Sequence, residues 1–268
     1  AVVIGGSLAL FAWRAPRVGL GGGFEPVSRE SMLLANNVLL LVAASAVLLG
    51  TLYPLVIDAL GMGKLSVGPP YFDTVFVPLM TPALFLMGIG PIARWRQASL
   101  PDLAYRLRWA FGVSVASAVV AFFALGKWTP MIGLGLALAA WIASTAVVAL
   151  VSRLKENSSP QWSRRFLAQP GSFYGMLLAH FGVAVFVVGV TIVSGFATEN
   201  DVRMEPGDTA SVAGYQVRLD KIEDVTGPNY QSSRATLTIS RDGKAVATVT
   251  PDRRVYNVSR SPMTEVAI

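Results

Sequence analysis

The sequence of 268 residues contains no cysteine, only one histidine and few charged residues, 14% of the total. Without cysteine the chain forms no disulfide, holds no metal through thiolates and has no cysteine nucleophile. The sequence also offers no Ser–His–Asp set, no carboxylate pair and no cluster with metal-ligand spacing. The usual site patterns of hydrolases and metalloenzymes are therefore missing, and any thiol chemistry must come from a partner.

Long apolar runs dominate the chain. Hydrophobic residues make up 53% of it and the mean hydropathy is +0.54, which is typical of a polytopic membrane protein. Five runs approach or exceed the roughly 20 residues that a membrane-spanning helix needs. They cover approximately Met32 to Leu60, Thr74 to Ala93, Trp109 to Leu125, Pro130 to Val151 and Phe173 to Phe196. We therefore predict five complete spans, and a partial one over Ala1 to Trp13 whose start is cut off.

Basic residues alternate between the connecting segments. One set of segments carries Arg14, Arg17, Arg29, Arg94, Arg96, Arg106, Arg108, Arg153, Lys155, Arg164 and Arg165. The other set carries only Lys64 and Lys127. Under the positive-inside rule the first set faces the cytoplasm, and the count of crossings then places everything after Phe196 in the periplasm. The expected location is thus the bacterial inner membrane, with multiple spans.

The distribution of the net charge of +6 along the chain also indicates membrane topology. Residues 1–196 hold 13 Lys and Arg against 6 Asp and Glu, whereas residues 197–268 hold 9 against 10. Because the basic excess is confined to the apolar part, we interpret it as a topology signal and expect no nucleic-acid partner.

Residues 197–268 have the character of a β-rich domain. Tyr215 to Ile222, Ala235 to Ser240 and Ala245 to Thr250 are rich in β-branched residues. Asp242-Gly243 between the last two runs predicts a hairpin. The predicted fold class is a polytopic α-helical membrane protein with a C-terminal periplasmic β-rich domain, divided into residues 1–196 and 197–268. At about 70 residues the domain is thin, and we expect it to be truncated or to lean on the membrane part.

His180 lies inside the 24-residue apolar run from Phe173 to Phe196. An ionisable group there is costly unless it has a partner or a task. One interpretation is structural, with a neutral imidazole that hydrogen-bonds to another helix. The other is a ligand of a metal or haem iron, or a proton relay. The small residues Gly175, Ala179, Gly182, Ala184 and Gly189 leave room for either, and the residues alone leave both interpretations open.

The segment from Gly61 to Asp73 is predicted to be a loop on the non-cytoplasmic side. Its centre, Gly68-Pro69-Pro70-Tyr71-Phe72, is expected to follow an extended path. The aromatic pair favours anchoring at the membrane interface over contact with a flat apolar ligand such as a quinone. Asn36, Asn37 and Tyr53-Pro54 in the second span are interpreted mainly as helix-contact residues, with ligand binding as the alternative.

Several strings in this chain are distinctive: GGSLALFAWRAPRV, GGGFEPVSRESMLLANN, GTLYPLV, GPPYFDTVFVPLM, GIGPIARWR, LAHFG, GPNY and SPMTEVAI. Together they resemble the C-terminal half of the CcmF family of cytochrome c-type biogenesis haem lyase subunits. They occur in order along nearly the whole chain, and Trp109 to Val151 matches least well.

The resemblance implies a membrane protein that works with a CcmH-type subunit. Such a protein receives haem from the haem chaperone CcmE and attaches it through thioether bonds to apocytochrome c. It also implies a resident b-type haem in the membrane, which takes electrons from quinol and reduces the incoming haem. In the LAHFG context, His180 matches one axial ligand of that b-type haem iron.

This chain departs from the family pattern in what it lacks. The Trp-rich haem-handling segment, the external histidines and the other membrane haem ligand are expected upstream of Ala1. The catalytic residues are therefore unknown, and we do not expect the chain to be active alone. The competing hypotheses are a non-enzymatic membrane scaffold or assembly subunit, in which His180 is structural, and a membrane transporter.

Overall fold

The computed structural model describes residues 2–17, 23, 25–63, 65, 67–156, 161–258 and 262–265. It divides into two compact units, Ala1–Gly195 and Phe196–Ile268, and each is considered on its own below. Ala1, Lys64 and Ile268, which enter the predictions of topology and domain bounds, lie outside the described residues.

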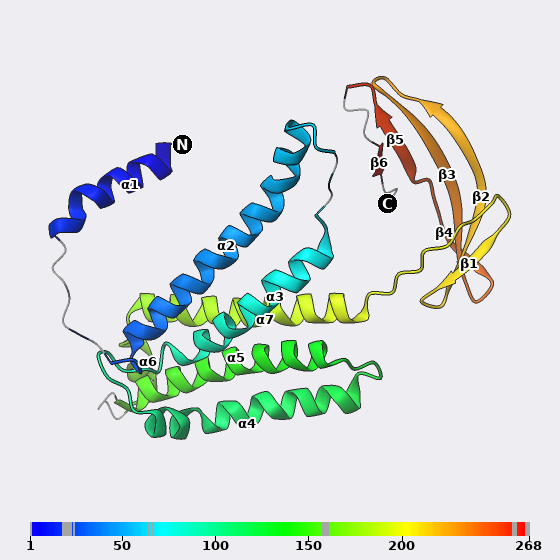
Figure 1. Cartoon of the computed structure of the whole chain (residues 1–268). Helices are drawn as coiled ribbons and strands as arrows, with labels where there is room; N and C mark the ends of the chain where they lie inside the picture. The colour runs from blue at the N-terminus through cyan, green and yellow to red at the C-terminus, as the bar shows by residue number, and fades with distance from the viewer. Residues whose placement is uncertain are drawn as a thin grey trace. The chain divides into compact units, whose positions relative to one another are not determined.

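The first unit is helical (Figure 1). Its elements are α1 (Val2–Arg14), the 3₁₀ turn η1 (Ala15–Arg17), α2 (Arg29–Ala59), α3 (Pro69–Ile89), α4 (Leu100–Ala124), α5 (Pro130–Glu156), α6 (Trp162–Leu167) and α7 (Gly171–Phe196). Helices α2, α3, α4, α5 and α7 are long and apolar enough to cross a bilayer. They confirm the predicted polytopic membrane fold, and α1 occupies most of the segment predicted to be a partial span.

Helix α4 begins earlier than predicted, at Leu100 instead of Trp109. Pro101 lies in the first turn of α4, where a backbone N–H has no carbonyl acceptor within the helix. The missing N–H of proline therefore costs no hydrogen bond there. Asp102 suits the positive end of the helix dipole, and its carboxylate pairs with Arg106 Nε at 3.1 Å, one turn on. The polarity of this turn hid it from a search for apolar runs, so Arg106 and Arg108 lie in the helix and not in a loop.

Helix α3 is also shifted, because it begins at Pro69 and ends at Ile89 instead of spanning Thr74 to Ala93. Gly68 is its extended N-cap, and the two prolines after it occupy the first turn. The segment predicted to be the centre of an extended loop is therefore the start of a helix. Ala93 is buried beyond the end of α3, in a small cluster with Ala98 and Leu103.

Helices α4 and α5 pack closely through serine hydroxyls. Ser114 Oγ donates to the carbonyl of Ala137 at 2.5 Å, and Ser117 Oγ donates to the carbonyl of Leu136 at 3.3 Å. Small hydroxyl residues let helix backbones approach in a membrane, where apolar burial gives little driving force. Ile142 on α5, with no exposed surface, lies in the core of this unit.

Helix α7 packs against α5 through small residues. A Cβ atom on Gly135 would clash with the side chain of Thr191. A Cβ atom on Gly195 would lie 2.6 Å from Ile132 Cγ1. Ala184, between these contacts and the start of α7, belongs to the same buried cluster as Ile142. Ala184 and Thr191 are therefore part of the packed contact between α7 and the helical core.

The second unit is one antiparallel sheet of six strands. They are β1 (Thr209–Val212), β2 (Tyr215–Thr226), β3 (Tyr230–Arg241), β4 (Lys244–Val249), β5 (Asp252–Tyr256) and β6 (Pro262–Glu265). The order is β1-β2-β3-β5-β6, and β4 pairs with the second half of β3 (Figure 1). The β-rich C-terminal domain is thus confirmed.

Two tight hairpins have both central residues at positive φ. Asp242 and Gly243 have φ values of 51° and 75°, so the predicted Asp-Gly hairpin joins β3 to β4. Ala213 and Gly214, with φ values of 50° and 81°, join β1 to β2 in the same way. Alanine seldom occupies this region, so the second hairpin has no recognisable turn signal in the sequence.

A buried carboxylate joins β3 to β5. Asp252 is 4% exposed, and its oxygens accept hydrogen bonds from Arg234 Nη2 at 3.3 Å and Arg254 Nε at 3.2 Å. Burial alone would raise the pKa of Asp252, but the two arginine donors outweigh it and hold that pKa below its usual value. The guanidinium of Arg254 also lies 4.5 Å from the ring centroid of Tyr230, next to the GPNY turn.

Candidate functional site

His180 lies in α7, nine residues after the helix begins at Gly171. At 1.5 Å per residue this is about 13 Å along the helix axis, a depth at which an imidazole does not reach water by extending to the interface. The side chain is half-buried. The residue singled out by the sequence is thus placed well inside a span.

One nitrogen of the His180 ring is fixed by its own helix. Nδ1 lies 2.8 Å from the carbonyl oxygen of Met176, one turn earlier. Because a carbonyl only accepts, Nδ1 must carry the proton and donate it, which leaves the lone pair of a neutral imidazole on Nε2. Nε2 has no hydrogen-bond partner among the described residues and is not enclosed.

This arrangement suits a metal ligand. A ligating histidine usually donates its other ring N–H to a carbonyl or carboxylate, which fixes the tautomer and the ring orientation. The structural interpretation instead required a hydrogen bond to another helix, and within the described part of the chain His180 makes none. Among those residues no three His, Asp or Glu side chains gather, so His180 would act as a single protein ligand.

The glycines of α7 do not lie beside the imidazole. With about 100° of rotation per residue, Gly175, Gly182 and Gly189 fall roughly 140–180° around the helix from His180. A Cβ atom on any of them would meet nothing within 4 Å in the first unit. Of the small residues expected around His180, Ala184 lies one turn further on and about 40° around the helix. The expectation that small residues leave room for a ligand beside His180 stays a prediction.

Tyr71 and Phe72 of the GPPYF motif contact α2. The Tyr71 phenol donates a hydrogen bond to the carbonyl of Ala46 at 3.0 Å. A Cβ atom on Gly50 would lie 2.6 Å from Tyr71 Cε1 and 3.4 Å from Phe72 Cε1. The two rings meet edge to face at 5.2 Å. Tyr71 thus joins two helices, and interface anchoring or ligand contact of the aromatic pair stays a prediction.

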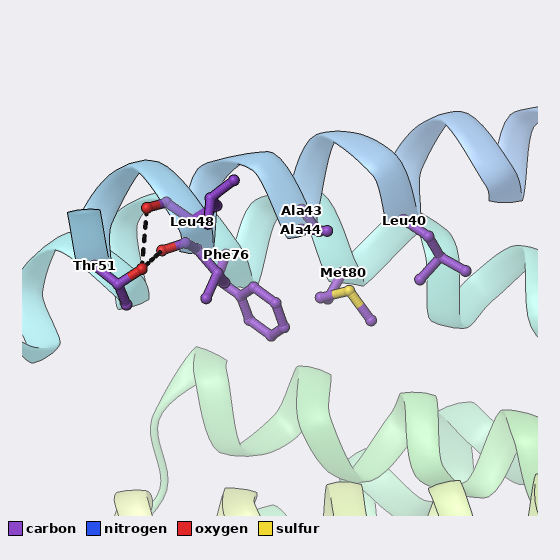
Figure 2. Close-up of a pocket in the computed structure, with 8 residues that line it drawn as sticks. Leu40, Ala43, Ala44, Leu48, Thr51, Phe76 and Met80 are labelled. Atoms are coloured by element: carbon purple, nitrogen blue, oxygen red, sulfur yellow. Dashed lines mark hydrogen bonds between the residues drawn. The ribbon is translucent and has the colours of Figure 1, made fainter. Parts of the chain in front are cut away.

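A shallow apolar groove of about 480 Å³ lies between α2 and α3 (Figure 2). It is lined by Leu40, Ala43, Ala44, Val47, Leu48, Thr51, Phe76 and Met80. Its one hydroxyl, on Thr51, donates to the carbonyls of Val47 and Leu48 and so is already used (Figure 2). The sequence analysis did not predict this groove. Its only signal in the sequence is a pair of alanines among larger apolar residues.

The polar residues noted in the second span do not join this groove. Asn36, Asn37, Tyr53 and Pro54 are absent from its lining. Asp58 and Asp73, near the ends of α2 and α3, are exposed. The structure therefore brings none of these residues together with His180 or with one another in a ligand site.

Comparison with known proteins identifies the family. The family model described as "CcmF C-terminal beta-sandwich" matches residues 195–268. The chain is 40% identical over 276 residues to the cytochrome c-type biogenesis protein CcmF of Pseudomonas aeruginosa, covering 100% of this chain and 40% of that protein. It is also 40% identical to CcmF of Escherichia coli K12 over 268 residues, again 100% of this chain and 40% of the relative.

A solved structure supports the fold. "Cytochrome c Heme Lyase CcmF" superposes with a TM-score of 0.57 at 22% identity, over 90% of this chain and 37% of that one. The chain thus spans about two fifths of the length of the curated relatives that it matches. With relatives at 40% identity along its whole length and the family's β-sandwich at its end, the chain belongs to the CcmF family of cytochrome c-type biogenesis proteins.

Proposed function

We propose that this chain forms part of a cytochrome c haem lyase and that His180 Nε2 is an axial ligand of a membrane-embedded b-type haem. The observation that carries the proposal is the state of the imidazole. Nδ1 is held by the Met176 carbonyl at 2.8 Å, and Nε2 has no partner among the described residues. Membership of the CcmF family supplies the chemical context.

The residues of α7 would serve a haem in two ways. The Met176 carbonyl holds the imidazole in one tautomer, with the lone pair on Nε2, and fixes the orientation of the ring. The apolar side chains of the surrounding helix would keep water from the site. When bound, the haem supplies one-electron redox chemistry between quinol and the haem that is to be attached. The second axial ligand would come from outside this chain, which has no other histidine.

The whole assembly would attach haem to apocytochrome c. In this proposal the haem chaperone CcmE delivers the substrate haem and a CcmH-type subunit assists. The absence of cysteine agrees with a division of labour in which the apocytochrome provides the thiols. We place the protein in the bacterial inner membrane with the β-domain, residues 197–268, in the periplasm. That domain would contact partners and not act in catalysis, because it carries no histidine or thiol.

The test is His180→Ala in the full-length protein, with Val185→Ala as the control. Val185 lies on α7 but is 71% exposed in the first unit. We expect His180→Ala to lose the reduced b-type haem absorption and to abolish cytochrome c maturation, and added imidazole to restore part of the absorption. Val185→Ala should keep both. A wild-type spectrum and a wild-type cytochrome yield in His180→Ala would overturn the assignment. A wild type without any chromophore would favour a scaffold or a transporter.

A further inference from the structure

The start of α2 and the connection between α3 and α4 form a built surface at the basic end of the helices. Backbone hydrogen bonds join residues 25–29 to residues 94–98 as a short ladder. They are Glu25 N to Arg96 O at 2.8 Å, Arg29 N to Arg94 O at 2.9 Å and Ala98 N to Val27 O at 2.7 Å. Ser28 is fully buried beneath it and caps α2. These hydrogen bonds fix the backbone that carries the side chains of this surface.

The backbone of Arg96 adopts an unusual conformation that specific contacts stabilise. It has a φ of 62°, in the left-handed region that an arginine rarely occupies. The Glu30 carboxylate accepts a hydrogen bond from the Arg96 backbone N–H at 2.8 Å and stabilises this turn. Beneath it lies the apolar cluster of Ala93, Ala98 and Leu103. The arginine is thus placed by packing and hydrogen bonds.

The surface carries five arginines against three carboxylates: Arg29, Arg94, Arg96, Arg106 and Arg108 against Glu25, Glu30 and Asp102. Asp102 is shared by Arg106 at 3.1 Å and Arg94 at 3.6 Å. Glu30 is used by a backbone N–H. Within the described part of the chain, three further guanidinium groups have no carboxylate within ion-pair distance. They belong to Arg29, Arg96 and Arg108.

Two of these arginines are stacked on exposed aromatic rings instead. The guanidinium of Arg29 lies 4.8 Å from the ring centroid of Trp95, and that of Arg108 lies 3.8 Å from the ring centroid of Tyr105. Trp95 is 59% exposed and Tyr105 is 63% exposed. Stacking holds the guanidinium groups in place while their N–H donors stay free.

The helix dipoles add to the positive potential of this surface. The N-termini of α2 and α4 both lie here, because the ladder joins the residues just before each of them. Arg29 occupies the first turn of α2, where a cation opposes the dipole. An anion bound at this surface would relieve both the unpaired charge and that opposition.

We propose that this basic end of the helices binds headgroups of anionic phospholipid, through Arg29 and Arg96 beside Trp95 and through Arg108 beside Tyr105 and Trp109, about 12 Å along α4 from its start. Exposed Trp and Tyr side chains at the ends of spanning helices lie at the headgroup level of a bilayer. Guanidinium groups at that level match a lipid phosphate in geometry and in charge. A soluble phosphate would use the arginines but not the apolar rings. The proposal does not depend on haem binding.

The test is native mass spectrometry of the full-length protein after incubation with equimolar phosphatidylglycerol and phosphatidylcholine. We expect wild type to retain phosphatidylglycerol preferentially and excess inorganic phosphate not to displace it. The variant Arg29→Gln/Arg96→Gln/Arg108→Gln should lose roughly fivefold in affinity per arginine, on the order of 100-fold in all. The control Arg203→Gln/Arg241→Gln/Arg253→Gln removes three exposed arginines of the β-domain and should retain the lipid as wild type does.

Single variants test the same proposal if the triple variant does not fold. Arg108→Gln alone should weaken retention about fivefold, and Arg108→Lys should lose less because it keeps the charge. Equal retention of both lipids by wild type would overturn the proposal. So would unchanged retention of phosphatidylglycerol by the triple variant, and displacement by inorganic phosphate would identify a soluble anion as the ligand instead.

Discussion

The phenol of Tyr71 donates a hydrogen bond to the carbonyl of Ala46, on the preceding helix, at 3.0 Å. The ring lies over Gly50, where a side chain would collide with it. Together these contacts join α2 to α3 near the ends that the short loop connects. The GPPYF motif is thereby explained as a joint between two helices, with the glycine on one and the tyrosine on the other.

We predict that Gly50→Ala destabilises the protein although alanine is the better helix former. The new methyl group would lie 2.6 Å from the Tyr71 ring, and overpacking of this kind costs about 1–3 kcal/mol. Gly112→Ala on α4 meets nothing within 4 Å and should stabilise by up to about 1 kcal/mol. Thermal unfolding in detergent measures both. A higher Tm for Gly50→Ala than for wild type would contradict the contact.

A second prediction concerns the joint between α3 and α5. Trp141 is 4% exposed, donates through Nε1 to the Phe85 carbonyl at 2.9 Å and stacks on the Phe85 ring at 5.1 Å. A Cβ atom on Gly88 would clash with the indole. Gly88→Ala should therefore lower the Tm in the wild-type background. In the Trp141→Phe background it should cost less, because the clashing indole nitrogen is gone.

The double-mutant cycle separates this contact from a general defect in α3. Trp141→Phe alone should cost about 1–3 kcal/mol through the lost hydrogen bond and the space left behind. If Gly88→Ala costs the same in both backgrounds, the two residues do not contact each other and the packing of α3 on α5 is wrong.

Features of the fold that depend on local interactions could be predicted from the sequence, and features that depend on contacts between distant segments could not. The five spans and the Asp242-Gly243 hairpin were predictable because apolar runs and turn residues are local signals. The ends of α3 and α4 were not, because proline at a first turn and a polar, amphipathic turn look like loop residues. Strands β1, β5 and β6 are short and were missed, since their pairing with longer strands stabilises them and their own composition does not.

The candidate site shows the same division. His180 was identifiable because an ionisable residue in a span is rare. Its hydrogen bond to the Met176 carbonyl depends on the conformation of the side chain, which the sequence does not specify. The positions of the glycines around α7 depend on helix geometry, which closeness in sequence conceals. The contact between Tyr71 and Gly50, and the ladder between residues 25–29 and 94–98, join segments far apart in sequence. No local pattern predicts such contacts.

A third prediction concerns topology and rests on the alternating basic segments. Reporter fusions after Arg96 and Arg165 should give a cytoplasmic signal, and a fusion after Asp208 should give a periplasmic one. Arg96 follows α3, Arg165 lies within α6 near its end, and Asp208 precedes β1. Alkaline phosphatase and fluorescent-protein fusions report the two sides independently. A cytoplasmic signal after Asp208 would overturn the count of crossings, and with it the periplasmic position of the β-domain.

The last prediction is an acid sensitivity of the β-domain through Asp252. Its pKa lies below the usual value of about 3.9 because Arg254 and Arg234 hydrogen-bond to the buried carboxylate. A carboxyl group with a depressed pKa in the folded state stabilises that state above its unfolded pKa, and this contribution is lost as the pH falls through the folded value. The stabilisation should therefore be complete at neutral pH and should disappear in the acid range below about pH 4.

Asp252→Asn removes the charge while keeping the size of the side chain, so wild type and variant should differ at pH 7 and converge as the pH falls below 4. Hydrogen–deuterium exchange of peptides from β3 and β5, compared between the two proteins at each pH, measures this difference. Asp224→Asn on β2 changes an exposed carboxylate that accepts a hydrogen bond from Ser233, which asparagine can also accept. That control should match wild type at pH 7. If Asp252→Asn is equally protected at pH 7, or if its difference from wild type persists unchanged at pH 3, the two arginines do not stabilise the sheet through the charge of Asp252.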